Sequence, residues 1–152
     1  MPYLVNCSIL FTELPLLERP AAAKSAGFDA IEFWWPFPTA TPDQAAVDRF
    51  VRAVRDAGVR LIGLNFAAGD MPGGDRGLLS LPGRSADFLA SVDIAVGIGA
   101  ELGTASFNAL YGNRVDEVSS REQDDLAAEN LAAAAAAAAR VSANVLLEPV
   151  SG

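Results

Sequence analysis

Three polar residues of this sequence, Asn65, Asn108 and Glu148, each follow an apolar run. Such runs are typical of buried strands, and the carboxyl ends of parallel strands meet at one rim where functional groups converge. Each Asn could instead cap the turn that follows its strand. Because three residues would converge, we favour a site at this rim. One carboxylate rarely makes a metal site or an acid–base site alone, so Glu148 needs partners.

The absence of histidine narrows the chemistry that this sequence could perform. It excludes Ser-His-Asp and Cys-His catalysis, and it removes the commonest zinc ligand. The single cysteine, Cys7, cannot form an intrachain disulfide, which fits a reducing compartment. Any reaction must therefore depend on carboxylates, amides, Arg, Lys or a metal ion held by oxygen ligands.

Charge and hydropathy exclude several classes of partner. The net charge of −8 argues against nucleic acid and against an anionic membrane surface, both of which attract clustered Lys and Arg. The apolar stretch near the N-terminus has no basic residue before it, and no uninterrupted apolar span is long enough for a membrane helix. We therefore expect a cytoplasmic protein, folded as a single domain over residues 1–152.

Apolar runs alternate with helical patterns along the whole chain. This alternation predicts an α/β fold, in which a parallel sheet is covered by helices. Strands are expected at 3–8, 30–34, 59–65, 104–110 and 143–148, and helices at 15–26, between Thr41 and Gly58, at 85–102 and at 120–140.

Local signals place the helix ends. Thr41 is predicted to cap the second helix, with a proline and a Gln in its first turn, and Ser120 is predicted to open the fourth helix with a capping box to Gln123. Pro20 should delay the regular part of the first helix. The motif 97–103 mimics a dinucleotide fingerprint, but it lies late in a helix, so we interpret it as close packing and a helix C-cap.

Two further segments could contribute to a site. The Gly-rich loop 66–83 follows a strand, and its length favours a functional lid on the carboxyl side of the sheet over a plain connection. The segment 32–38 concentrates aromatic residues, which could line a pocket or could equally plug a barrel or form an interface. Glu32 lies inside a predicted strand, where burial without a polar partner would be costly.

With these residues placed, the chain resembles the hydroxypyruvate isomerase family of xylose-isomerase-like TIM barrels. The segments that carry the resemblance are 10–15 (LFTELP), 26–33 (AGFDAIEF), 69–70 (GD), 81–84 (LPGR) and 146–148 (LLE). A full barrel of this type takes about 250 residues. The resemblance therefore implies a TIM-barrel fold truncated after the fifth parallel strand.

The resemblance also implies a reaction and its residues. Hydroxypyruvate would be converted to tartronate semialdehyde through an enediol, with two carboxylates shuttling the proton. Glu148 would be one of these acids and a ligand to a divalent metal, Mg²⁺ or Mn²⁺. Asn108 stands where some relatives carry His. The residues implied to bind the substrate are Asn65, Asn108, Phe33, Asp70 and Arg84.

Other functions stay open at this point. The substrate could be another small sugar acid such as 2-oxo-tetronate, or the chain could be a non-catalytic remnant. A related DNA-repair endonuclease is disfavoured by the charge and the lack of histidine. We expect the 152 residues alone to be inactive, because the acids and metal ligands of later strands are missing. We also expect them to pair with a second copy or with the missing half, through the edges of the first and fifth strands.

Overall fold

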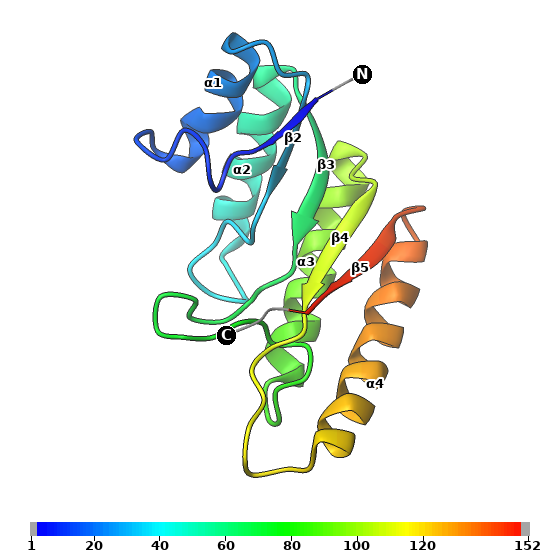
Figure 1. Ribbon diagram of the computed structural model, residues 1–152. Coiled ribbons are helices and arrows are strands. Elements are labelled where there is room, and N and C mark those ends of the chain that lie inside the picture. The colour runs from blue at the N-terminus through cyan, green and yellow to red at the C-terminus, as the bar shows by residue number, and fades with distance from the viewer. Residues whose placement is uncertain (1–2, 150–152) are drawn as a thin grey trace.

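The computed structural model describes residues 3–149 as five parallel strands in one sheet with helices beside it (Figure 1). The strands lie side by side in chain order. They are β1 (Leu4–Asn6), β2 (Ala30–Phe33), β3 (Arg60–Asn65), β4 (Ser106–Leu110) and β5 (Asn144–Glu148). The helices are the 3₁₀ turn η1 (Leu16–Glu18), α1 (Arg19–Ser25), α2 (Gln44–Ala57), α3 (Ser85–Leu102) and α4 (Ser120–Ala139). The predicted α/β class and element order are confirmed.

The helices cover one face of the sheet, and the core lies between them and the strands (Figure 1). Phe33 of β2 packs edge-on against Phe50 of α2 at 5.3 Å between ring centroids. Phe107 of β4 stacks on Phe66 at 5.4 Å. None of the helices in the described range 3–149 is long and apolar enough to cross a membrane.

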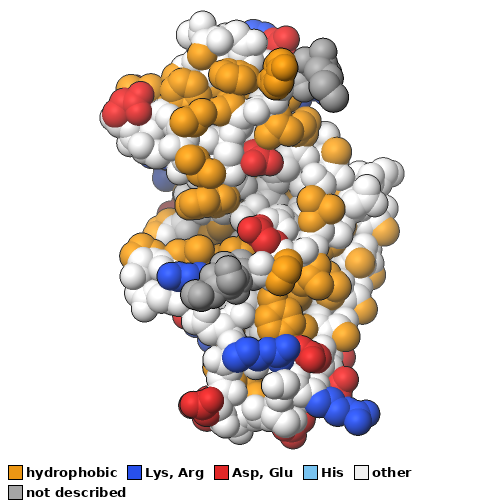
Figure 2. Space-filling view, in the orientation of Figure 1, with side chains coloured by type: hydrophobic (Ala, Val, Ile, Leu, Met, Phe, Trp, Pro, Cys, Tyr) orange, Lys and Arg blue, Asp and Glu red, His pale blue; other side chains and the backbone are white. Residues whose placement is uncertain are grey.

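The opposite face of the sheet carries no helix within the described residues. Figure 2 shows hydrophobic side chains spread across this face. Leu4, two residues before Asn6 on β1, is 45% exposed, and Leu146 of β5 is 54% exposed. In a closed barrel such side chains face the interior, so this surface corresponds to the inside of a barrel.

Two predicted helix caps are wrong by one or two residues. Asp43, and not Thr41, caps α2, because its backbone is extended and its carboxylate accepts a hydrogen bond from Ala46 N at 2.6 Å. The capping box of α4 joins Ser119 and Glu122, and not Ser120 and Gln123. A cap requires an extended residue followed at once by helical backbone, and sequence spacing alone does not fix where that change occurs.

Two other local predictions, the late start of the regular first helix and the role of the motif 97–103, are confirmed. The turn η1 comes first, and Pro20 lies in the first turn of α1. Gly103 ends α3 in the left-handed conformation and donates to Gly99 O at 2.8 Å. A side chain at Gly99 would come within 2.6 Å of the ring of Phe107. The motif 97–103 therefore serves packing and helix termination.

The loop that joins β3 to α3 (residues 66–84, here the β3–α3 loop) starts at the carboxyl end of β3, as predicted. Its second half is not a mobile cover, since Leu79 and Ser80 are fully buried. Their N–H groups donate to Leu110 O, at the end of β4, and to Tyr111 O, just beyond it, and Asn130 of α4 donates to Leu79 O at 2.8 Å. This half of the loop is fixed between β4 and α4, and a lid function stays a prediction for the exposed tip.

Candidate functional site

A pocket lies on the open face of the sheet, toward the carboxyl ends of the strands. Its volume is about 490 Å³, which is within the size range of small-molecule sites. Every strand contributes to it. The lining residues are Asn6, Ile9, Glu32, Trp34, Gly63, Leu64, Asn65, Ser106, Phe107, Asn108, Leu146, Leu147 and Glu148.

Three predicted site residues come together in this pocket. Asn65 and Asn108 are register partners on β3 and β4. Asn108 is paired with Leu146 on β5, so Glu148, two residues further along, points to the same face. The Asn108 side-chain amide donates a hydrogen bond to Glu148 Oε2. The structure brings these three residues together in one pocket, where Asn108 holds the exposed Glu148 carboxylate, and their role as a site stays a prediction.

A second acid–amide pair, Asn6 with Glu32, lines the same pocket. Both are register partners on β1 and β2, and Asn6 Nδ2 donates to Glu32 Oε1 at 3.0 Å. The amide is itself oriented, because Asn6 Oδ1 accepts from Ser8 N at 2.9 Å. Asn6 was not predicted as a site residue. The strand predicted over residues 3–8 extends past Asn6, whereas β1 ends at Asn6, so the sequence did not mark this residue as a strand end. Asn6 is the polar partner that Glu32 requires.

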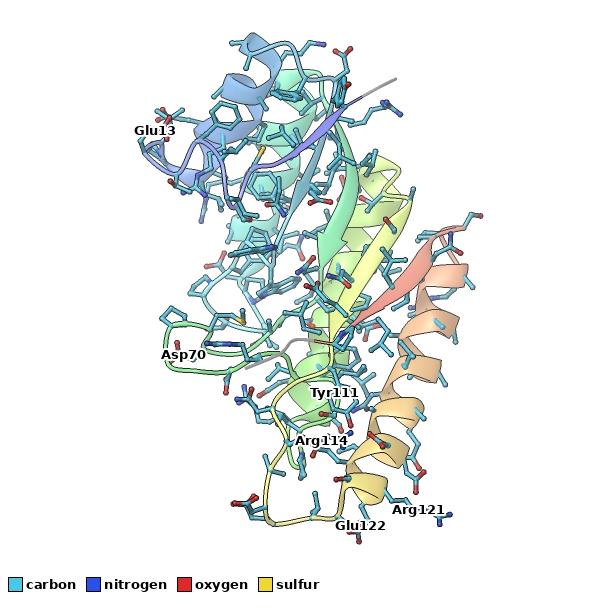
Figure 3. The ribbon with its side chains drawn as sticks, viewed as in Figure 1. Glu13, Asp70, Tyr111, Arg114, Arg121 and Glu122 are labelled. Carbon is cyan, nitrogen blue, oxygen red and sulfur yellow. The ribbon has the colours of Figure 1, made fainter. Side chains whose placement is uncertain are left out.

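The structure places Phe33, Asp70 and Arg84 away from this pocket. Phe33 is 1% exposed and belongs to the core, because strand side chains alternate and its neighbour Glu32 takes the pocket side. Asp70 lies in the tip of the β3–α3 loop, where its carboxylate accepts from Gly73 N at 3.0 Å (Figure 3). Arg84 pairs with Asp87 at 2.8 Å. These three residues therefore do not line the described pocket, and a role of theirs in substrate binding stays a prediction.

The aromatic segment after β2 divides between two roles that sequence reasoning left open. Trp34 is 46% exposed and lines the pocket. Trp35 packs edge-on against Phe37, and Phe37 against Phe50 of α2. One aromatic ring thus belongs to the site and the others extend the core.

The pocket is acidic. Its lining contains two carboxylates, Glu32 and Glu148, and no Lys or Arg among the described residues that form it.

The thiol of Cys7, next to β1, has a raised pKa of about 11. Burial is the main cause; Arg19 opposes it, and Glu32 adds a smaller upward effect. The thiol is therefore protonated at neutral pH and is a poor nucleophile.

Metal ligands are sparse in this part of the chain. Within residues 3–149 no three His, Cys, Asp or Glu side chains lie close enough together to hold a metal ion. Glu148 has the oxygen chemistry that Mg²⁺ and Mn²⁺ prefer, but a single acid does not form a site. The described residues therefore do not complete the expected metal centre.

A polar cluster outside the pocket fixes the segment between β4 and α4. Arg114 Nη2 donates to Asp124 Oδ1 at 2.8 Å, the Tyr111 hydroxyl donates to the same carboxylate, and Arg114 lies 4.9 Å from the Tyr111 ring centroid (Figure 3). The hydrogen bond from Tyr111, and next that from Arg114, lowers the pKa of Asp124. The cluster joins the segment to α4 and has no group in the pocket.

Comparison with known proteins identifies relatives of this chain. A Streptomyces coelicolor protein named "Putative hydroxypyruvate isomerase" is 55% identical over 149 residues, which are 97% of this chain and 53% of that protein. A 2-oxo-tetronate isomerase from Cupriavidus necator is 35% identical over 98% of this chain and 55% of its own length. The chain thus spans about half the length of the curated relatives it matches.

A solved structure and a family model agree with this result. The crystal structure described as an AP endonuclease, family 2, from Brucella melitensis superposes with a TM-score of 0.82 at 30% identity, covering 99% of this chain and 56% of that one. The family model "Xylose isomerase-like TIM barrel" matches residues 20–152. Because this match covers most of the chain and agrees with its parallel sheet, the protein belongs to the xylose isomerase-like TIM barrel family.

Proposed function

We propose that these residues supply the N-terminal half of the active site of an isomerase that interconverts hydroxypyruvate and tartronate semialdehyde. The observation that carries the proposal is the Glu148 carboxylate at the carboxyl end of β5, held in the pocket by Asn108. The names of the relatives from S. coelicolor and C. necator support an isomerase over other members of the fold.

The reaction moves a proton between adjacent carbons of the substrate. Glu148 takes the proton from C3 of hydroxypyruvate, and the electron pair of that C–H bond forms the C2–C3 double bond. The π pair of the C2 carbonyl moves onto its oxygen, which takes up a proton to complete the enediol. A proton then returns to C2, while the C3 hydroxyl loses its proton and becomes the aldehyde. Asn108 donates to Oε2 of Glu148, which leaves Oε1 available to receive the proton.

A divalent metal ion, Mg²⁺ or Mn²⁺, is a further part of the proposal, with Glu148 as one ligand. Such an ion would polarise the carbonyl and hydroxyl oxygens of the substrate. The residues in the described range do not form a complete ligand set, so no step above depends on the ion.

A second candidate substrate is 2-oxo-tetronate, and the relative from C. necator favours it.

Endonuclease activity is disfavoured, although the similar B. melitensis structure is described as an AP endonuclease. DNA phosphates require Lys and Arg, whereas the described lining of this pocket carries two acids and the chain has a net charge of −8. A free, buried Cys7 supports the cytoplasm as the location.

The test is turnover of hydroxypyruvate by the complete gene product, with Mg²⁺ or Mn²⁺ added and the aldehyde product followed by NMR. Glu148→Gln should lower kcat by at least about a hundredfold, the usual effect of removing a general base. Glu13→Gln, an exposed acid far from the pocket, is the matched control (Figure 3). The 152-residue chain alone should show no turnover, because the acids and metal ligands expected from the later strands of the barrel are not part of it. Full activity of Glu148→Gln would refute the proposal.

A further inference from the structure

The pair formed by Asn6 and Glu32 has no role in the reaction steps above, although it lines the pocket. Glu32 Oε1 is occupied by the Asn6 amide at 3.0 Å. Among the described residues, Oε2 receives no hydrogen bond, and Gly63 lies beside it. A carboxylate oxygen that faces a pocket without a donor is available to a ligand.

Gly63 gives this carboxylate its room. A Cβ at this position would lie 3.2 Å from Glu32 Cβ and 3.3 Å from Oε2. Because Gly63 is the register partner of Glu32 on β3, the missing side chain leaves space directly beside the carboxylate. The sheet thus holds Glu32 between an amide donor on one side and the bare backbone of Gly63 on the other.

The charge of the pocket limits what Glu32 can bind. An anionic carboxylate repels the carboxylate of a keto acid, and the described lining offers no Lys or Arg to offset this repulsion. A hydroxyl group, in contrast, donates a hydrogen bond to a carboxylate, and such charge-assisted bonds are stronger than neutral ones. The described half of the pocket is therefore suited to the hydroxyl end of a substrate and not to its acid end.

We propose that Glu32, positioned by Asn6, binds a hydroxyl group of the substrate and so selects hydroxylated keto acids, with the substrate carboxylate directed away from this half of the pocket. The proposal rests on the proposed isomerase function for its substrate class. Glu32 contacts the substrate, and Asn6 is a positioning residue that acts through it.

Pyruvate and hydroxypyruvate make a suitable pair of probes, because they differ by a single hydroxyl group. Binding of each is measured by calorimetry to the complete gene product carrying Glu148→Gln, which prevents turnover during the titration. The readout is the ratio of the two affinities. Removing a negative charge at Glu32 would strengthen the binding of both anions alike, so the ratio isolates recognition of the hydroxyl.

In this background we expect hydroxypyruvate to bind about tenfold more tightly than pyruvate. Adding Glu32→Gln should reduce the ratio to less than about threefold, since the charge-assisted bond is lost. Asn6→Ala and Gly63→Ala, which disturb Glu32 from its two sides, should also reduce the ratio. Glu13→Gln should leave it unchanged.

Each outcome separates this inference from the isomerase proposal. A ratio that Glu32→Gln leaves unchanged, or a protein that binds neither probe, overturns the role of Glu32. Glu32→Gln could lower the affinity ratio while the complete gene product without any substitution fails to convert hydroxypyruvate. That result supports the role of Glu32 and refutes the isomerase function. If Glu32→Gln does not fold by circular dichroism, the ratios of Gly63→Ala and Asn6→Ala decide, and unchanged ratios in both overturn the inference.

Discussion

Replacing Gly99 by Ala in α3 tests the packing between that helix and β4. Alanine favours a helix over glycine by about 1 kcal/mol. At Gly99, however, the added Cβ would lie 2.6 Å from Phe107 Cζ, well inside the contact distance of about 3.5–4.0 Å between carbon atoms. Phe107 is fully buried and stacked on Phe66, so it has little room to move. Overpacking of this kind costs about 1–3 kcal/mol.

Gly97 provides the matched control two residues earlier in the same helix. It is exposed, and a Cβ there meets nothing within 4 Å. Gly97→Ala should therefore raise the free energy of unfolding by roughly 0.5–1 kcal/mol, whereas Gly99→Ala should lower it by about 1 kcal/mol. Urea denaturation followed by tryptophan fluorescence measures both changes. Equal stability of the two variants would show that Phe107 yields freely and that the packing argument is wrong.

Three further predictions concern caps, pH and association. Ser119→Ala should lower the free energy of unfolding by about 1 kcal/mol, while Ser120→Ala should change it little; a reversed order in urea denaturation would restore the cap predicted from sequence. The pKa of the Cys7 thiol is raised to about 11 from 9.0, so its contribution to stability is complete below pH 9 and is lost as pH rises toward 11, by roughly 2–3 kcal/mol. Urea titrations at pH 9 and pH 11 should show a smaller loss in the free energy of unfolding for Cys7→Ala than for the unsubstituted chain. An equal loss in both would show that the Cys7 thiol does not cause this pH dependence. The 152-residue chain should associate at micromolar concentration, because β5 is an edge strand and its Leu146 and Leu147 are exposed; a stable monomer in light scattering would contradict this.

The sequence predicted the order and type of the elements because hydrophobic periodicity is a local property. The boundaries of α3, for example, were predicted as observed. The N-caps at Asp43 and Ser119 were not predicted, because Thr41 and Ser120 are also residue types that are favoured at helix N-caps. Only the backbone conformation distinguishes them, and tertiary packing sets that conformation.

Only those residues of the pocket that a local sequence pattern marks could be predicted. Asn65, Asn108 and Glu148 were found because each ends an apolar run, which is visible in the sequence. The pairing of Asn6 with Glu32 depends on the register between two strands, which no local pattern specifies. Phe33 was expected to bind substrate from the family resemblance alone, and its side chain faces the core because a one-residue step along a strand reverses the side of the sheet.

The consecutive order of the strands also has a consequence for how the chain folds. Each described strand pairs with the next one in sequence, so no pairing has to wait for a distant segment. The two acid–amide hydrogen bonds of the pocket join residues only 26 and 40 positions apart. Loop closure of this length has a modest entropic cost, and domains form from the N-terminus during synthesis. The sheet can therefore grow one βα unit at a time as the ribosome releases the chain, and the strands that carry Asn6 and Glu32 are released well before the strand that carries Glu148.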